Sequence, residues 1–345
     1  MSKPIYPQKP IIIVVGPTAS GKSDLAVKLA QRFNGEIISA DSRQVYRGMD
    51  IGTGKVPLSK PPRAQRPPYP APLTQRGARG VKPSGYYGGI AHYLIDVVSP
   101  TRRFTAAQYK KLAQAAIKKI QSKNKVPIVC GGTGFYIRAL IDNLNIPAVK
   151  PDLKLRAKLE KKTTQELFRE LKKLDPRRAA FIDRQNPRRL VRALEIVYKT
   201  GKVVPAPNPP TPLCVRGATE FAPLVKGGEG GLKSLFLGLQ IPRPKLAQRI
   251  KTRLKKRLKQ GMLAEVKKLR AQGLSWKRLG SFGLEYRWLA RFLQNKISYK
   301  EMTERLQKDI EHYAKRQMTW FQRDPRIHWI KNSAQAEKIV RNFLK

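Results

Sequence analysis

The segment from Gly16 to Ser23 constrains the fold of this chain more than any other. It reads GPTASGKS and satisfies the phosphate-loop pattern G-x-x-x-x-G-K-[ST] at every position. The β-branched run IIIVV at 11–15 precedes it and is typical of a buried parallel strand, while the amphipathic stretch DLAVKLAQRF that follows is typical of a helix. The sequence therefore predicts a strand, a phosphate-binding turn and a helix in direct succession.

A loop of this kind binds phosphate groups mainly through its backbone. Glycines allow N–H groups to point at an anion, the helix N-terminus adds its dipole, and Lys22 adds a positive charge. Ser23 is the expected ligand of a Mg2+ ion that bridges the phosphates, so Mg2+ is the expected cofactor. The pattern indicates a diphosphate or triphosphate without specifying ATP. We expect the whole loop to line the phosphate site: Gly16, Pro17, Thr18, Ala19, Ser20, Gly21, Lys22 and Ser23.

Further apolar runs predict the rest of a sheet. They are EIISADS, in which the strand ends at Asp41, and then AHYLIDVVSP, VPIVCGG and SLFLGLQI. Strands that alternate with helices indicate an α/β fold, here a P-loop NTPase-like parallel sheet flanked by helices. An ordinary NTPase also places a Walker-B carboxylate after a buried strand, and Asp41 and Asp96 are the two candidates.

Composition divides the chain into four parts. Residues 1–148 form the first part of the core, and within them 56–90 hold eight prolines and no acidic residue, which predicts a flexible basic insertion. Apolar residues at helical spacing predict an inserted all-helical domain over 149–202. A loose linker insertion is expected at 203–233. Residues 234–345 should supply a returning strand and the C-terminal helices.

The balance of charge indicates a polyanionic partner. The 345 residues include 71 Lys and Arg but only 23 Asp and Glu, a net charge of +48. Each phosphate that such a protein neutralises releases counterions, which favours binding; a host with generally basic proteins is the alternative explanation.

Two cysteines and three histidines form no zinc spacing or disulfide framework. The N-terminus lacks the apolar run of a signal peptide, so we expect a cytoplasmic protein without a membrane partner, monomeric by default.

Several segments of the chain are informative in combination. In order, they are GPTASGKS, ADSRQVY at 40–46, DIGTGK at 50–55, HYLID at 92–96, GGTGFY at 131–136, NPRRLVRALE at 186–195 and KRQMTWF at 315–321. Together they resemble the tRNA dimethylallyltransferase family, also called isopentenyl-tRNA transferases. The resemblance extends over nearly the whole chain apart from two insertions. A phosphate loop alone is common, whereas its combination with D-S-x-Q-x-Y, G-G-T and K-R-Q-x-T-W is specific.

The resemblance implies a reaction and its catalytic residues. Enzymes of this family transfer a dimethylallyl group from dimethylallyl diphosphate to N6 of the adenosine just 3′ of the tRNA anticodon, A37, and release diphosphate. The implied partners are therefore dimethylallyl diphosphate and a tRNA anticodon stem-loop. By similarity Asp41 is the general base, Thr133 contacts the diphosphate oxygens, and Arg253 supports diphosphate binding.

The resemblance also implies contacts to tRNA, spread over the core and the helical domain. They are Asp41, Ser42, Arg43, Gln44, Arg156, Arg188, Arg189, Leu190, Val191 and Arg192. One segment departs from the family pattern. The corresponding family segment is usually written around G-Y-[KR]. Here Leu284 and Glu285 intervene between Gly283 and Tyr286, so no tRNA contact is assigned to this segment.

The residues by themselves leave alternatives open. Asp41 could be a helix N-cap or a Walker-B-like carboxylate, Thr133 could cap the next helix, and Arg253 could belong to a solvated helix face. For the whole chain, the alternative function is a P-loop kinase that phosphorylates a nucleoside or small molecule. A third class is an ATP-dependent nucleic-acid-binding protein without transferase chemistry.

Overall fold

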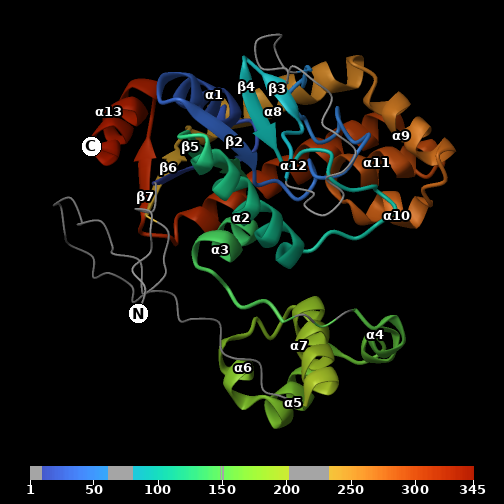
Figure 1. Ribbon diagram of the computed structural model, residues 1–345. Helices are drawn as coiled ribbons and strands as arrows, with labels where there is room; N and C mark the ends of the chain where they lie inside the picture. The colour runs from blue at the N-terminus through green and yellow to red at the C-terminus, as the bar shows by residue number, and fades with distance from the viewer. Residues whose placement is uncertain (1–9, 61–80, 148, 150, 202–232) are drawn as a thin grey trace, which may run out of the picture. The chain divides into compact units, whose positions relative to one another are not determined.

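The chain folds into two compact units, which the Cα arrangement separates as 1–143 with 220–345, and 144–219. The structure is a computed structural model (Figure 1). It describes residues 10–60, 81–147, 149, 151–201 and 233–345. Each unit is considered by itself below.

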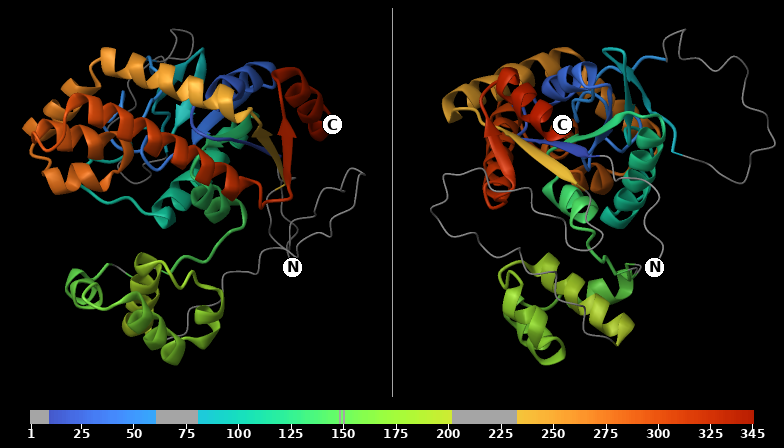
Figure 2. Two further views of the ribbon diagram at one scale, coloured as in Figure 1. Left: turned by 180° about the vertical axis from the view of Figure 1, so that it is seen from behind. Right: turned by 60° about the vertical axis from the view of Figure 1, so that its left-hand side comes forward.

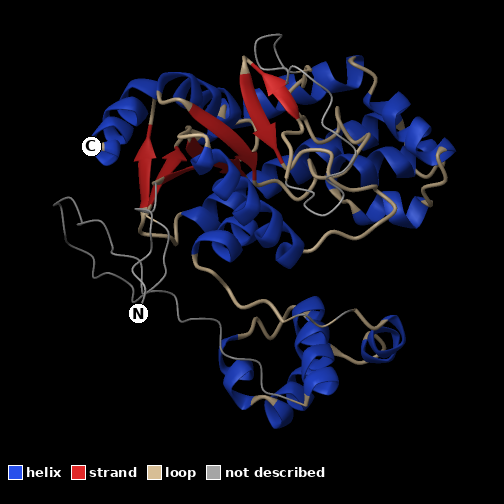
Figure 3. Ribbon diagram, in the orientation of Figure 1, coloured by secondary structure: helices blue, strands red, loops and turns tan. Residues whose placement is uncertain are grey.

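A seven-stranded sheet forms the centre of the first unit. Its strands are β1 (Ile11–Val15), β2 (Gly35–Ser39), β3 (Gly85–Tyr87), β4 (Ile90–Tyr93), β5 (Val126–Gly131), β6 (Ser234–Leu239) and β7 (Ile327–Ile330). Their order is β3-β4-β2-β5-β1-β6-β7, and every pair is parallel except β3 with β4. The predicted parallel sheet flanked by helices is confirmed, with one antiparallel strand at its edge (Figure 3).

Helices cover both faces of this sheet because alternate residues of each strand point to opposite sides. They are α1 (Lys22–Arg32), α2 (Ala106–Ser122), α3 (Gly134–Ile141) and α13 (Ser333–Leu344). Ile11, Ile13 and Val15 of β1 pack with α2 and α3, whereas Ile12 and Val14 pack with α1 and α13 (Figure 1). The continuous apolar run that predicted β1 thus reflects burial on both faces.

The remaining helices of the first unit build a separate apolar cluster. They are α8 (Arg243–Lys259), α9 (Met262–Ala271), α10 (Trp276–Ser281), α11 (Leu284–Leu293) and α12 (Tyr299–Phe321). The long helices α8 and α12 lie side by side (Figure 2). Val45, Tyr46 and Met49, from the segment after β2, are buried within this cluster. The helices therefore hold the segment that carries Asp41.

The second unit consists of short helices around its own core. They are α4 (Leu153–Leu159), α5 (Thr164–Leu174), α6 (Pro176–Phe181) and α7 (Pro187–Thr200). Asn186 caps α7 by accepting a hydrogen bond from the N–H of Arg189, and Pro187 occupies the first helical position, where no donor is needed. Leu167, Leu171 and Leu190 are buried where α5 and α7 pack together.

Part of the expected flexible insertion is ordered. Residues 81–90 include β3, which lies within the range 56–90 that composition predicted to be flexible throughout. Ser59 and Tyr86 also exchange two backbone hydrogen bonds, at 2.8 and 3.0 Å. Two aromatic residues with high strand propensity suffice here because β4 offers an edge to pair with. The middle of this insertion, 61–80, and most of the expected linker, 202–232, lie outside the described residues.

No helix in the described ranges combines the length and the apolar character that crossing a lipid bilayer requires.

Candidate active site

Three neighbouring strands bring the predicted catalytic segments to one edge of the sheet. β2, β5 and β1 are adjacent and parallel, with Ser39 opposite Cys130 and Val15 opposite Gly131. The segments that follow these strands carry Asp41, Thr133 and the phosphate loop. Because carboxyl ends of parallel strands share an edge, residues far apart in sequence meet there, which is where α/β proteins bind ligands.

The phosphate loop presents groups suited to an anion. Gly21 immediately precedes α1 with a φ of +90°, a conformation that glycine adopts readily, and it leaves the first N–H groups of the helix uncovered. Burial lowers the pKa of Lys22, whose Nζ donates to the carbonyl of Pro17 at 3.2 Å. The buried hydroxyl of Ser20 has no hydrogen-bond partner among the residues that the structure describes. Such unsatisfied groups fit a bound phosphate.

Gln317 of α12 joins the phosphate loop to the segment after β5. Its Oε1 accepts a hydrogen bond from the backbone N–H of Thr18 at 2.8 Å, and its Nε2 donates to the carbonyl of Gly132 at 2.9 Å. The side chain is buried, and its bond to Gly132 is shielded from water. Gln317 belongs to the K-R-Q segment of the resemblance, but nothing in that pattern shows what its amide contacts, so the sequence did not predict this role.

Asp41 lies in a turn directly after β2 and is half-buried. Its Oδ1 accepts hydrogen bonds from the backbone N–H groups of Arg43 at 2.8 Å and Gln44 at 3.4 Å. No helix begins between residues 40 and 60, all of which the structure describes, so Asp41 is not a helix N-cap. The turn fixes the carboxylate beside the phosphate loop, where its charge acts on Lys22.

Thr133 occupies the position before α3, yet its hydroxyl is directed elsewhere. Oγ1 accepts a hydrogen bond from the backbone N–H of Ser42 at 3.0 Å instead of from the first turn of the helix. Its own N–H donates to the carbonyl of Ala40 at 3.1 Å. Thr133 thus ties the end of β5 to the end of β2, and its hydroxyl hydrogen is left for another acceptor.

Arg253 is partly buried on α8 and does not belong to a solvated helix face. Burial and the neighbouring charge of Arg257 lower the pKa of Arg253 to about 10. Its Nη2 donates to the carbonyl of Gly54 at 3.4 Å, and Gln44 donates to the same carbonyl at 3.4 Å. The Asp41 carboxylate acts to raise the pKa of Arg253, and the Arg253 guanidinium acts to lower the pKa of Lys22. The structure therefore places Arg253 with the sheet-edge residues.

Two salt bridges organise the loop that carries Gly54. Lys55 donates to Asp50 Oδ1 at 2.6 Å, to Asp96 Oδ1 at 2.5 Å and to the carbonyl of Tyr46 at 2.6 Å, so its buried ammonium is satisfied. Asp96 was one of the two candidates for a Walker-B acid. In the structure its carboxylate is bound to Lys55. Glu265 accepts three backbone N–H bonds from the same loop. Sequence reasoning missed Lys55 and Glu265 because their partners are distant in the chain.

The predicted tRNA contacts of the core lie around the same turn. Ser42, Arg43 and Gln44 are partly buried, and the Arg43 guanidinium lies 5.8 Å from the centre of the Phe282 ring. Phe282 also stacks under Arg278, at 4.4 Å. Two guanidiniums thus share one aromatic ring, a contact that sequence reasoning did not anticipate.

The predicted tRNA contacts of the helical unit divide into three groups. Arg188 and Arg189 are exposed on the first turn of α7. The side chains of Leu190 and Val191 are buried in the core of the unit and do not face solvent. Arg156 and Arg192 bind the fully buried Glu195: Arg156 donates to both of its oxygens, at 2.8 and 2.7 Å, and Arg192 to Oε2 at 2.5 Å. This local charge pairing occupies two of the expected phosphate-binding residues.

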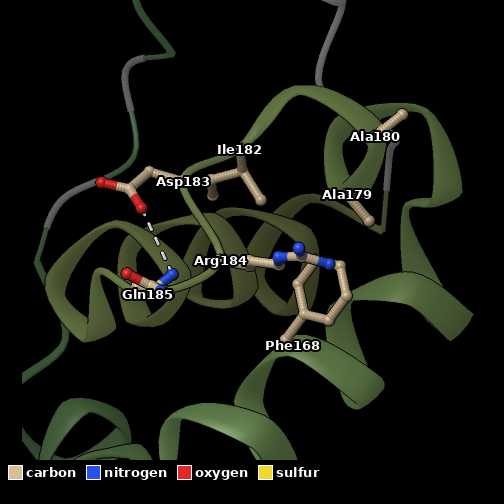
Figure 4. Close-up of a pocket in the computed structure, with 7 residues that line it drawn as sticks. All are labelled: Phe168, Ala179, Ala180, Ile182, Asp183, Arg184 and Gln185. Atoms are coloured by element: carbon tan, nitrogen blue, oxygen red, sulfur yellow. Dashed lines mark hydrogen bonds between the residues drawn. The ribbon is translucent and has the colours of Figure 1, made fainter.

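The helical unit also holds a cavity of about 450 Å3 (Figure 4). Phe168 of α5 and Ala179 of α6 give it apolar walls, and the segment from Ile182 to Gln185 borders it. The backbone N–H of Gln185 donates to Asp183 Oδ1 at 3.2 Å, which closes the turn before α7. Since the cavity residues other than Asp183 and Arg184 carry no charge, they do not constitute a catalytic cluster.

Comparisons with known proteins agree on one family. Residues 82–324 match the family described as IPP transferase, and residues 9–66 match isopentenyl transferase. The tRNA dimethylallyltransferase of Pelotomaculum thermopropionicum is 35% identical, over 98% of this chain and 96% of that protein. The tRNA isopentenylpyrophosphate transferase of Bacillus halodurans superposes with a TM-score of 0.63 at 29% identity, covering 98% and 97%. A eukaryotic dimethylallyltransferase acting on tRNA gives 0.66 at 25% identity, covering 96% and 78%.

Proposed function

The chain belongs to the IPP transferase family, and we propose that it transfers a dimethylallyl group from dimethylallyl diphosphate to N6 of the adenosine 3′ of a tRNA anticodon. Its relatives are named tRNA dimethylallyltransferases, which makes it a prenyltransferase enzyme. One observation carries the assignment of the site. The phosphate loop, Asp41 and Thr133 follow three adjacent parallel strands and therefore meet at one sheet edge.

Diphosphate binding is the role of the cationic side of this edge. The N–H groups at the start of α1 and the ammonium of Lys22 would bind the donor's phosphates. Arg253 would stabilise the negative charge that grows on the leaving diphosphate as the C1–O bond breaks. Thr133 would donate its hydroxyl hydrogen to a phosphate oxygen, since Thr133 Oγ1 already accepts a hydrogen bond from the Ser42 N–H.

Asp41 is the proposed general base. The adenine N6 attacks C1 of the dimethylallyl group, the C1–O bond to diphosphate breaks with its electron pair, and one N6 proton passes to the Asp41 carboxylate. The turn around Asp41 supports this role because two backbone N–H groups hold Oδ1 and thereby orient the carboxylate. Positioning matters more than basicity here, because the exocyclic amine of adenine is a weak nucleophile.

Mg2+ is the proposed cofactor, which the Ser23 hydroxyl and the diphosphate would hold. Among the described residues, no three His, Cys, Asp or Glu side chains gather closely enough to hold a metal ion. One protein hydroxyl together with the substrate's phosphates suits Mg2+, which usually binds through one or two protein ligands together with substrate phosphates and water. When bound, the ion would neutralise part of the charge on the diphosphate.

A tRNA anticodon stem-loop is the proposed second substrate. The net charge of +48 favours a large polyanion, and Arg188 and Arg189 are exposed cations on the helical unit. Ser42, Arg43 and Gln44 lie beside the proposed base, where a flipped adenosine would have to enter. A cytoplasmic location and a monomeric state belong to the same proposal.

One assay separates this function from that of a P-loop kinase. The purified protein is mixed with Mg2+, labelled dimethylallyl diphosphate and unmodified tRNA, and label in the RNA is followed over time. We expect label in tRNAs with adenosine 3′ of the anticodon and none in a matched transcript with guanosine there. Consumption of ATP without transfer of label to tRNA would contradict the proposal.

A further inference from the structure

A buried ion pair lies beside the proposed diphosphate site and has no part in the chemistry described so far. Arg257 of α8 donates from Nη1 to Glu285 Oε1 at 3.1 Å, and the two side chains are 11% and 12% exposed. The same Nη1 donates to the carbonyl of Gly52 at 3.4 Å. Arg257 therefore connects α8 with both α11 and the loop that carries Gly54.

Arg257 also lies against Arg253, one helical turn earlier on the same face of α8. Both guanidiniums converge on Gly54, where a Cβ would overlap Nη2 of each arginine. Gly54 also has a φ of +62°, which side-chain-bearing residues rarely adopt. The two cations are thus packed against one glycine, and the repulsion between them must be offset.

The buried Glu285 directly follows a residue with an uncommon backbone conformation. Leu284 has a φ of +38°, in the left-handed region that side-chain-bearing residues rarely adopt. Burial raises the pKa of Glu285, and the charges of Arg257 and Arg253 act in the opposite direction. A strained backbone with a buried acid is retained only where the surroundings hold it in place.

The geometry points to Glu285 as a positioning residue, which acts through Arg257 to hold the Arg253 guanidinium and the 52–54 loop ready for the diphosphate. Replacing a buried ion pair by apolar residues is often neutral for stability, so stability alone does not explain the pair. The inference rests on the proposed function, because it takes the phosphate loop to be the diphosphate site.

A purely electrostatic role for Glu285 and a positioning role predict opposite effects of its removal on the binding of an anion, which makes the inference testable. The groups whose charges act on Glu285 are Arg257, Arg253 and Asp41, and its own charge acts on Tyr286 and Tyr313. If Glu285 contributed only a negative charge, its removal would strengthen the binding of an anion nearby. If it positions Arg257 and Arg253, its removal weakens that binding.

The test measures the binding of inorganic pyrophosphate with Mg2+ to the full chain by calorimetry. We expect Glu285→Gln and Arg257→Met each to raise the Kd about tenfold, a change of about 1.4 kcal/mol. In the Arg257→Met background, Glu285→Gln should add less than about twofold, because the residue acts through Arg257. The KM for dimethylallyl diphosphate should rise and kcat should fall, because Arg253 also stabilises the charge that grows on the leaving diphosphate, whereas the KM for tRNA should stay within about threefold.

Two further variants keep the result interpretable. Glu285→Gln leaves an unpaired buried cation and could unfold, so Arg257→Met/Glu285→Leu, which removes both charges, is expected to fold and still to bind pyrophosphate about tenfold more weakly. Glu36→Gln is the matched control, a buried carboxylate on β2 bound to Lys123 and Lys125, and should leave the Kd unchanged.

The outcomes separate the two proposals. Unchanged or tighter pyrophosphate binding by the folded variants, or an equal effect of Glu285→Gln in both backgrounds, would overturn the positioning role. If the wild-type protein bound no pyrophosphate and transferred no label, the proposed function itself would fail, whatever the variants did.

Discussion

The backbone N–H of Ser42 donates a hydrogen bond to Thr133 Oγ1 at 3.0 Å across the ends of β2 and β5. This bond holds the turn that carries Asp41 against the strand next to the phosphate loop. It links the proposed base to the proposed diphosphate contact, so a change at Thr133 should affect both.

We predict that Thr133→Val lowers the rate of transfer to tRNA about tenfold, whereas Thr133→Ser stays within about threefold. Valine has the shape of threonine but leaves the Ser42 N–H unpaired, which costs about 1–3 kcal/mol. Serine keeps the oxygen and loses only a methyl group. Steady-state kinetics at saturating tRNA measure the effect, and equal losses in the two variants would argue that packing of the methyl group matters instead of the hydroxyl.

Asp41→Asn should lower kcat by about 100- to 10,000-fold, the usual contribution of general-base catalysis. Asparagine keeps an oxygen that can accept the Arg43 and Gln44 N–H bonds, so the turn should persist. Pyrophosphate and tRNA affinities should therefore stay within about threefold of wild type. Single-turnover transfer together with filter binding distinguishes the cases, and a large loss of tRNA affinity would contradict a role confined to proton transfer.

Buried parallel strands were the most predictable part of the fold. β1, β5 and β6 are continuous apolar runs because helices or neighbouring clusters cover both of their faces, and such runs stand out in a sequence. β3 lies in a proline-rich segment, and β7 has only four residues, of which His328 is exposed. Their pairing with β4 and β6 defines these edge strands, and local sequence does not contain that information.

The site likewise has a part that could be predicted from the strands and a part that could not. Asp41, Thr133 and the phosphate loop could be brought together because parallel strands share an edge. Helical spacing does not show which basic residue of α8 is buried, so Arg253 depended on a resemblance and Arg257 was not identified. Glu195 lies 39 residues from Arg156, and no pattern shows that these two residues form a buried pair.

Exposure distinguishes the arginines of the helical unit, and binding to tRNA should reflect it. The double variant Arg188→Glu/Arg189→Glu should weaken tRNA binding at least about tenfold and reduce the slope of log Kd against log salt by about 2. Its thermal stability should change little, because both side chains are exposed. An unchanged salt slope would place the tRNA contacts elsewhere on the chain.

Arg156→Met should lower the stability of the helical unit, in contrast to the variants at Arg188 and Arg189. This arginine donates to both oxygens of Glu195, so its loss leaves a buried carboxylate with Arg192 as its remaining charged partner and should destabilise the helical unit by about 2–3 kcal/mol. Hydrogen exchange of the α7 amides measures that loss locally. A stable variant with weak tRNA binding would instead show that Arg156 acts directly on tRNA.

The helical unit should lose stability in acid through Glu195. Burial opposes ionisation of this carboxylate, but hydrogen bonds from Arg156 and Arg192 outweigh it and lower its pKa from 4.5 to about 2. Because the folded pKa is the lower one, the stabilisation is complete above pH 4.5 and is lost as pH falls from 4.5 to 2; it amounts to about 3 kcal/mol. Hydrogen exchange of α7 across this range, compared with Glu195→Gln, isolates the contribution because other carboxylates titrate in both proteins. The stability gap between the two should close by pH 2, and a gap independent of pH would show that Glu195 is not ionised in the folded unit.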